Sequence, residues 1–250
     1  MNWNQVEDQI LELSDRGLEA FKYGQLDAAE MLLDEAAEIA RNSALQQPTV
    51  ASLSTYATLL MNIAMVLDKM GANPEVISKL EYAETFLTRV IETGAVEHEH
   101  THATLLMRLA AAYEGPSEYL IPGRVDPPSA IEMQSFRRES LRSARLGGRL
   151  PMTLGEGQQL KKLAILDHAV VLMKKLYRSQ RVPYESQLPY ALMLLGKTYL
   201  DLGNSYDAES PLLEAFGMYN KLARESPQLY NQHLQASMSL LSRTHSDSAN

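Results

Sequence analysis

The chain has 250 residues, of which 45% are hydrophobic and 22% charged, and its formal net charge is −8, a composition typical of globular proteins. It contains no cysteine, which excludes disulfides, thiolate chemistry and zinc–thiolate sites. Its first residues lack the apolar core of a signal peptide, and no window approaches the roughly 18 apolar residues of a membrane span. We therefore expect a cytoplasmic protein without a membrane partner.

The charges are distributed unevenly along the chain. Residues 1–100 hold 17 acids and 6 bases, a net charge of −11, whereas residues 124–181 hold 12 bases and 5 acids, a net charge of +7. Charge at this density favours partners of the opposite sign and raises encounter rates. Two solvated surfaces of opposite sign are the simpler interpretation of the same pattern.

Apolar residues recur at helical spacing through most of the chain. This periodicity predicts a first hairpin over 4–42, a second from about 50 to 92, a third beginning near 99 and a clear hairpin over 184–223. A last helix over 226–241 has no partner in the sequence, so we expect either that it caps the array or that the chain is a piece of a longer protein. Because Ala-Thr-Leu-Leu-Met occurs at Ala57 and again at Ala103, the pattern indicates stacked repeats.

The middle of the chain interrupts this regularity. Loop signals crowd residues 115–128, helical character returns over 129–146, and glycines break it again up to Gly157. We therefore predict four segments: helical hairpins over 1–114, an irregular basic insertion or distorted hairpin over 115–157, a C-terminal hairpin with flanking helices over 158–243, and a flexible tail over 244–250.

Residues 189–222 closely resemble a tetratricopeptide repeat (TPR). The matching positions are Leu195, Gly196, Tyr199, Gly203, Tyr206, Ala208, Leu212 and Ala215. Residues 10–43 match less fully, and 57–71 and 103–113 resemble the longer repeats of kinesin light chain. The resemblance implies an all-α, right-handed TPR-like helical-hairpin solenoid, in which the first helix of each hairpin lines a concave groove that binds proteins.

The resemblance places eight candidate partner-binding residues on those first helices. They are Met61, Asn62, Met65, Lys69, Met107, Arg108, Met193 and Lys197. In kinesin light chain an asparagine clamps the peptide backbone, and Asn62 occupies the matching place, whereas Arg108 and Leu195 depart from that pattern. Methionine suits an adaptable binding surface, but it also fills gaps in a core, so both interpretations of these methionines stay open.

A second candidate surface is a run of arginines at helical spacing, formed by Arg137, Arg138, Arg142, Arg145 and Arg149. Arginine suits bidentate capture of carboxylate or phosphate. The run can pair with the acidic first hairpin, bind an acidic protein segment or bind nucleic acid. Nucleic acid is disfavoured because the isoelectric point is about 5.3 and only Phe136 is nearby for stacking.

Three further patterns carry weak signals for chemistry. Alternating histidines at His98, His100 and His102 suggest a metal site, but alternate residues converge only in an extended chain, and a polar turn before a helix is the simpler interpretation. The glycines from Gly147 to Gly157 match no phosphate-binding fingerprint. His168 beside Asp167 fits a core or rim position. No set passes the criteria for an active site, so we expect no metal, no cofactor and no enzyme activity.

The sequence therefore predicts a noncatalytic scaffold or adaptor that docks a protein or peptide, of acidic character, in the concave groove. One alternative is a charge-gated module whose acidic N-terminal arm masks the basic central surface. Another is nucleic-acid binding through the arginine-rich helix. Self-association through the terminal helix is a structural alternative.

Overall fold

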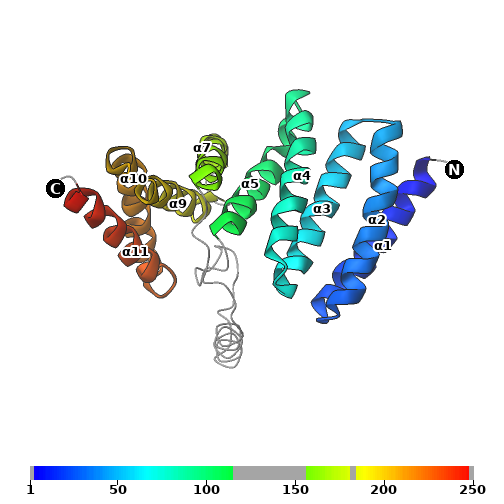
Figure 1. Cartoon of the computed structure of the whole chain (residues 1–250), viewed down its shortest axis with the longest axis horizontal. Helices are drawn as coiled ribbons and strands as arrows, with labels where there is room; N and C mark the ends of the chain where they lie inside the picture. The colour runs from blue at the N-terminus through cyan, green and yellow to red at the C-terminus, as the bar shows by residue number, and fades with distance from the viewer. Residues whose placement is uncertain (1–2, 115–155, 181–183, 248–250) are drawn as a thin grey trace. The chain divides into compact units, whose positions relative to one another are not determined.

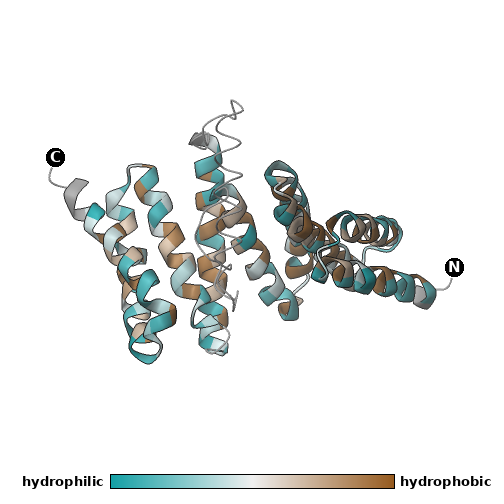
Figure 2. Ribbon diagram, turned by 90° about the horizontal axis from the view of Figure 1, so that it is seen from below, coloured by the Kyte–Doolittle hydropathy of each residue, from teal (hydrophilic) through white to brown (hydrophobic). Residues whose placement is uncertain are grey.

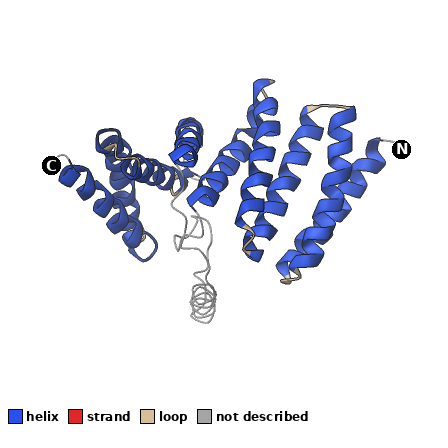
Figure 3. Ribbon diagram, viewed as in Figure 1, coloured by secondary structure: helices blue, strands red, loops and turns tan. Residues whose placement is uncertain are grey.

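The computed structural model describes residues 3–114, 156–180 and 184–247, and within these ranges the chain is α-helical without a strand (Figure 3). The helices, labelled in Figure 1, are α1 (Trp3–Lys22), α2 (Leu26–Gln46), α3 (Val50–Met70), α4 (Asn73–Glu92), α5 (Glu99–Glu114), α7 (Glu156–Ser179), α9 (Gln187–Asp201), α10 (Ser205–Glu225) and α11 (Pro227–Asp247), with a 3-10 turn at Val96–His98. The predicted all-α fold is confirmed.

The chain groups into two compact units. Unit 1 contains α1 to α5 together with Ile165–Gln180 of α7, and unit 2 contains α9, α10 and α11. The residues of α7 up to Ala164 group with unit 2. The sequence placed all of α7 with the C-terminal hairpin, whereas the second half of this helix packs in unit 1.

Three hairpins repeat one residue pattern. At the same spacing each time, a small residue on the first helix is followed by a small or branched residue and then a leucine on the second: Gly17 with Ala29 and Leu33, Ala64 with Val76 and Leu80, and Gly196 with Ala208 and Leu212. All of these residues are buried. A Cβ added at Gly17 would lie 2.8 Å from Leu33 Cγ, and one added at Gly196 would lie 2.4 Å from Leu212 Cγ. The glycines therefore set how closely the paired helices approach.

The turns of the same three hairpins are also alike. Gly24, Gly71 and Gly203 have φ values of 74°, 78° and 75°, in the left-handed region that favours glycine. The residue after each glycine donates its backbone N–H to a carbonyl in the last turn of the first helix, as Asn204 does to Tyr199 at 2.9 Å. This is the hydrogen-bond pattern of a Schellman motif, and it satisfies a carbonyl that the helix end leaves unpaired.

The most apolar helix is α3, which is long and apolar enough to cross a membrane by length and composition alone. The expectation that no stretch of the chain is apolar enough to span a membrane is therefore wrong for α3. In the structure 67% of the 18-residue apolar stretch of α3 is buried inside the protein, and its buried residues include Ile63 and Val66. Because α2 and α4 pack on either side of α3, its hydropathy is explained by a core position in unit 1. Figure 2 shows apolar and hydrophilic bands alternating along the helices.

Within unit 1, α5 packs against α4 and also makes side-chain contacts with the second half of α7, which follows it only after a long stretch of chain. Lys175 on α7 forms an ion pair with the buried carboxylate of Glu99 on α5. One turn further along α5, the ring of His102 lies edge-on to His168, with centroids 5.1 Å apart. The sequence located His168 at a core or rim position, and this contact is consistent with a rim position.

The last helix, α11, packs against α10 in unit 2. Tyr219 of α10 is buried, with the ring of His233 stacked on it at a centroid distance of 5.2 Å and that of Tyr230 at 6.5 Å. Of the two interpretations that the sequence left open for this helix, the structure thus supports a helix that covers its neighbouring hairpin. Leu229 and Met238 of this helix are exposed.

Candidate functional site

The first candidate site lies on the exposed side of the first helices of unit 1. On α3 this side carries a row of exposed or half-buried residues at helical spacing, namely Thr55, Thr58, Asn62, Met65 and Lys69, and on α5 it carries Thr101, Thr104, Met107 and Arg108. Five of the eight candidate residues from the sequence fall in these rows. Apart from the two methionines the rows are polar, and threonine, asparagine and methionine offer adaptable contacts to a peptide.

Two of the methionines that were predicted to contact a partner are buried instead. Met61 is 6% exposed and Met193 is 5% exposed, so both belong to the hydrophobic core. The prediction that these side chains are presented to a ligand is wrong, because neighbouring helices cover the face of the helix on which they lie. Lys197, the remaining predicted residue, is half-buried in unit 2, where its ammonium pairs with Asp201 at 2.8 Å.

Arg108 has the most unusual environment on this surface. Its guanidinium reaches from α5 to α3 and donates to the backbone carbonyl of Met61, with Nη1 and O 3.5 Å apart. Burial lowers the pKa of Arg108 from its usual value, and the charge of Asp68 partly opposes this effect. No carboxylate lies within ion-pair distance of Arg108 in the part of the chain that the structure describes. The side chain is therefore a half-buried cation with one long hydrogen bond.

The arginine surface formed by Arg137, Arg138, Arg142, Arg145 and Arg149 lies outside the described residues, as do Gly147, Gly148 and Gly155 of the glycine loop. The predictions for these segments stay predictions.

The histidine segment forms a 3-10 turn and the start of α5, as the simpler interpretation of the sequence predicts. His102 is 1% exposed, and neither ring nitrogen has a hydrogen-bond partner. Burial, and secondarily His168, lower its pKa to about 4. Among the described residues no group of three potential metal ligands comes together. His102 is therefore a buried neutral imidazole.

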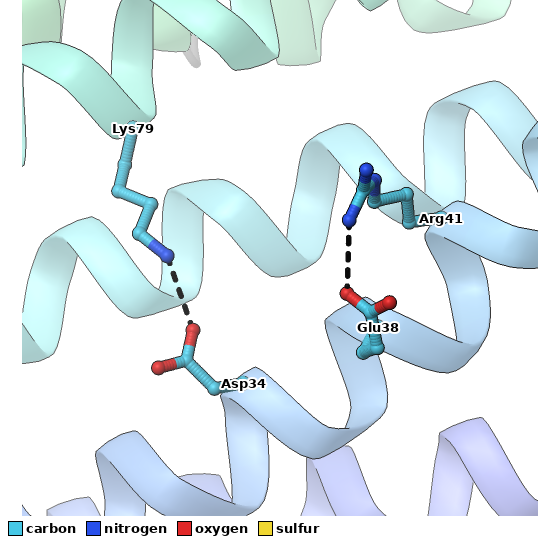
Figure 4. Close-up of polar contacts among 4 residues, drawn as sticks. All are labelled: Asp34, Glu38, Arg41 and Lys79. Atoms are coloured by element: carbon cyan, nitrogen blue, oxygen red, sulfur yellow. Dashed lines mark hydrogen bonds and ion pairs between the residues drawn. The ribbon is translucent and has the colours of Figure 1, made fainter.

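A second candidate site, which the sequence did not predict, is an open cleft of about 430 Å³ between α2 and α4, with α3 below. It is lined by Asp34, Ala37, Glu38 and Arg41 of α2, Tyr56 and Leu60 of α3, and Ser78, Lys79 and Tyr82 of α4. Lys79 crosses the cleft to Asp34, with Nζ and Oδ1 3.1 Å apart, and Arg41 pairs with Glu38 on the same helix at 3.3 Å (Figure 4).

Aromatic rings form one side of this cleft. Tyr56 and Phe86 each lie edge-to-face against Tyr82, with centroids 6.0 Å and 5.0 Å from it. Tyr56 is buried, and burial together with the nearby Tyr82 raises its pKa to about 12, so its hydroxyl stays protonated and neutral. Tyr82 is 46% exposed. The cleft thus combines a fixed, partly exposed ring with two carboxylates and two cations.

No protein-family model matches the chain, and no curated protein matches it. Among solved structures, it is similar to a kinesin light chain with nearly identical TPR-like repeats from Podosopora anserina, at 15% identity over 96% of this chain and 95% of that chain, with a TM-score of 0.49. It is also similar to a de novo designed helical repeat protein, at 16% identity over 99% of this chain and 97% of that chain, with a TM-score of 0.36. A thermophilic TPR protein of Thermus thermophilus is similar at 17% identity over 96% of this chain and 100% of that chain, with a TM-score of 0.23.

The shared residue pattern and turn of the three hairpins, described above, define the class of this fold. It is an all-α, TPR-like helical-hairpin repeat fold, as the resemblance at residues 189–222 implied. Folds of this class are typical of protein-interaction scaffolds and are generally noncatalytic.

Proposed function

We propose that this chain is a noncatalytic, cytoplasmic scaffold or adaptor that binds an acidic segment of a partner protein across α3 and α5 of unit 1. The observation that supports this most strongly is the environment of Arg108. Asn62, Met65 and Met107 are half-buried on the same two helices and are suited to contact the backbone and apolar side chains of the segment.

The argument rests on the free energy of burying a charge. A desolvated cation destabilises a protein unless a carboxylate or several hydrogen bonds compensate it. Arg108 has one hydrogen bond of 3.5 Å, and it goes to a carbonyl within α3 that the helix itself already uses as an acceptor. A guanidinium has five N–H donors in a planar fork, which matches a carboxylate. A partner carboxylate would therefore supply the compensation that the free protein lacks.

The variant Arg108→Met tests this proposal through two readouts of opposite sign. Removing the charge should raise the free energy of unfolding by about 1 kcal/mol, because the half-buried cation is poorly compensated and methionine fills a similar space. Binding of the acidic partner should weaken by about 2 kcal/mol, roughly thirtyfold, because a half-buried charge pair is lost. Urea unfolding measures the first effect, and affinity capture from nuclease-treated lysate with quantitative mass spectrometry measures the second.

The matched control is Arg89→Met, since Arg89 lies on α4 in the same unit and the change removes the same charge. Proteins retained by the native chain and by Arg89→Met, but lost with Arg108→Met, would support the proposal. Equal capture by all three baits would contradict it, and so would loss of the same proteins with both variants, which would indicate attraction by net charge alone.

A further inference from the structure

The cleft between α2 and α4 lies beside the most acidic part of unit 1. The helices α1 and α2 together carry ten acidic and three basic residues, a net charge of −7. The charged groups lining the cleft sum to zero, because Asp34 and Glu38 are balanced by Lys79 and Arg41. The surrounding field therefore decides which sign of ligand is attracted, and it favours a cation.

The ion pairs already present in the cleft do not saturate its carboxylates. Asp34 and Glu38 each accept from one cation in the structure, at 3.1 Å and 3.3 Å. An ionised carboxylate can accept about four hydrogen bonds, so each keeps room for a further donor. All four charged side chains are at least one-third exposed, so rearranging these pairs costs little.

The exposed ring of Tyr82 adds a contact that is selective for cations. Tyr82 is held by edge-to-face contacts with Tyr56 and Phe86, which fix the ring while leaving 46% of the residue exposed. An arginine or lysine side chain within about 6 Å of such a ring is attracted by its quadrupole. The apolar stem of the same side chain can pack on the aromatic and aliphatic floor formed by Tyr56 and Leu60.

We propose that this cleft is a docking site for a basic segment of a partner protein and that it receives one arginine or lysine side chain, whose cation is bound by Asp34, Glu38 and the ring of Tyr82. Its volume of about 430 Å³ is sufficient for one long side chain with its neighbouring backbone. The site is separate from the surface of Arg108, is lined mainly by other helices and takes a ligand of the opposite charge, so either proposal can fail without the other.

The test uses the full chain and two fluorescein-labelled peptides of equal length, one rich in arginine and one rich in glutamate, followed by fluorescence anisotropy. The arginine-rich peptide should bind. Glu38→Gln should weaken this binding about fivefold, and Tyr82→Leu, which keeps an apolar side chain but removes the ring, about threefold. The control is Glu35→Gln, an identical charge change at an exposed position of the same helix outside the cleft, which should alter binding less than about twofold.

Three results would overturn the proposal. If Glu35→Gln and Glu38→Gln weaken binding equally, the peptide follows the general field of α1 and α2 and the cleft is not its site. If the glutamate-rich peptide binds instead, and Arg41→Gln or Lys79→Gln abolishes that binding, the cleft takes an acidic ligand. Chemical-shift mapping of backbone amides supports the proposal if the arginine-rich peptide shifts residues on both sides of the cleft, and contradicts it if α1 alone responds.

Discussion

Replacing Gly196 by alanine is expected to lower the stability of unit 2 by about 2 kcal/mol, although alanine is the better helix former. The added Cβ would lie 2.4 Å from Leu212 Cγ and 3.2 Å from the backbone oxygen of Ala208. The leucine can shift only by disturbing a fully buried position, and the backbone oxygen belongs to the paired helix. Thermal unfolding of the variant by calorimetry measures the loss.

Gly217 provides the matched control, because it lies inside α10 with nothing within 4 Å of an added Cβ. The same change there should raise stability by about 1 kcal/mol through helix propensity. A second check is the pair Gly196→Ala with Leu212→Ala, whose combined loss should be smaller than the sum of the single losses, since the shorter side chain makes room for the Cβ. Equal stabilisation by alanine at both glycines would show that helix contact does not require glycine at position 196.

The stability of unit 1 is expected to fall at acidic pH because of His102. Its pKa is lowered to about 4 in the folded protein, while an unfolded histidine has a pKa of about 6.5. Above pH 6.5 the imidazole is neutral in both the folded and the unfolded chain, so it does not make the free energy of unfolding depend on pH. As the pH falls from 6.5 to 4 only the unfolded chain takes up the proton, so stability is lost progressively, by about 3 kcal/mol in total.

The groups that face His102 set the size of this effect. His168 on α7 lies edge-on to its ring and disfavours a second positive charge, whereas the carboxylate of Glu84 on α4, 4.0 Å from Nε2, can partly compensate one. Glu99 on the same helix is already paired with Lys175. His102→Leu should therefore flatten the stability profile between pH 6.5 and 4 relative to the native chain.

Urea unfolding at a series of pH values, followed by circular dichroism, gives the two profiles. The difference between the two profiles gives the contribution of His102 alone, because the carboxylates protonate in both proteins and cancel. His100→Gln, at an exposed position of the same helix, is the control and should follow the native profile. A His102→Leu profile as steep as the native one would show that His102 does not cause the loss.

The two proposed sites give unit 1 surfaces for ligands of opposite charge. Arg108 on the first helices is a cation that lacks a carboxylate, and the cleft beside α2 holds carboxylates in an acidic field. An adaptor needs two surfaces that do not compete, and sites on different faces of one unit meet that need. The opposite charges also discourage each ligand from occupying the wrong surface.

The hairpins could be predicted from the sequence because their signals are local. Helical periodicity identifies the paired helices, and Gly24, Gly71 and Gly203 mark turns in which the backbone adopts a left-handed conformation. The resemblance at Leu195, Gly196 and Ala208 identified the repeat type, and the structure supplies its physical reason, which is close contact between the two helices at Gly196. These features depend on residues close together along the chain, so a sequence pattern can contain them.

The sites could not be predicted in the same way, because they depend on which helix covers which face. Met61 and Asn62 are adjacent in sequence, yet neighbouring helices bury the methionine and leave the asparagine half-exposed. Arg108 is desolvated only because α5 packs near α3, and the cleft exists only because α2 and α4 bring Asp34 and Lys79 together. The sequence alone determined the helices, their turns and the pairing within the hairpins α1–α2, α3–α4 and α9–α10, but not where α7 and α11 pack. Tertiary packing decided exposure, desolvation and the meeting of distant charges, because these quantities depend on neighbours in space.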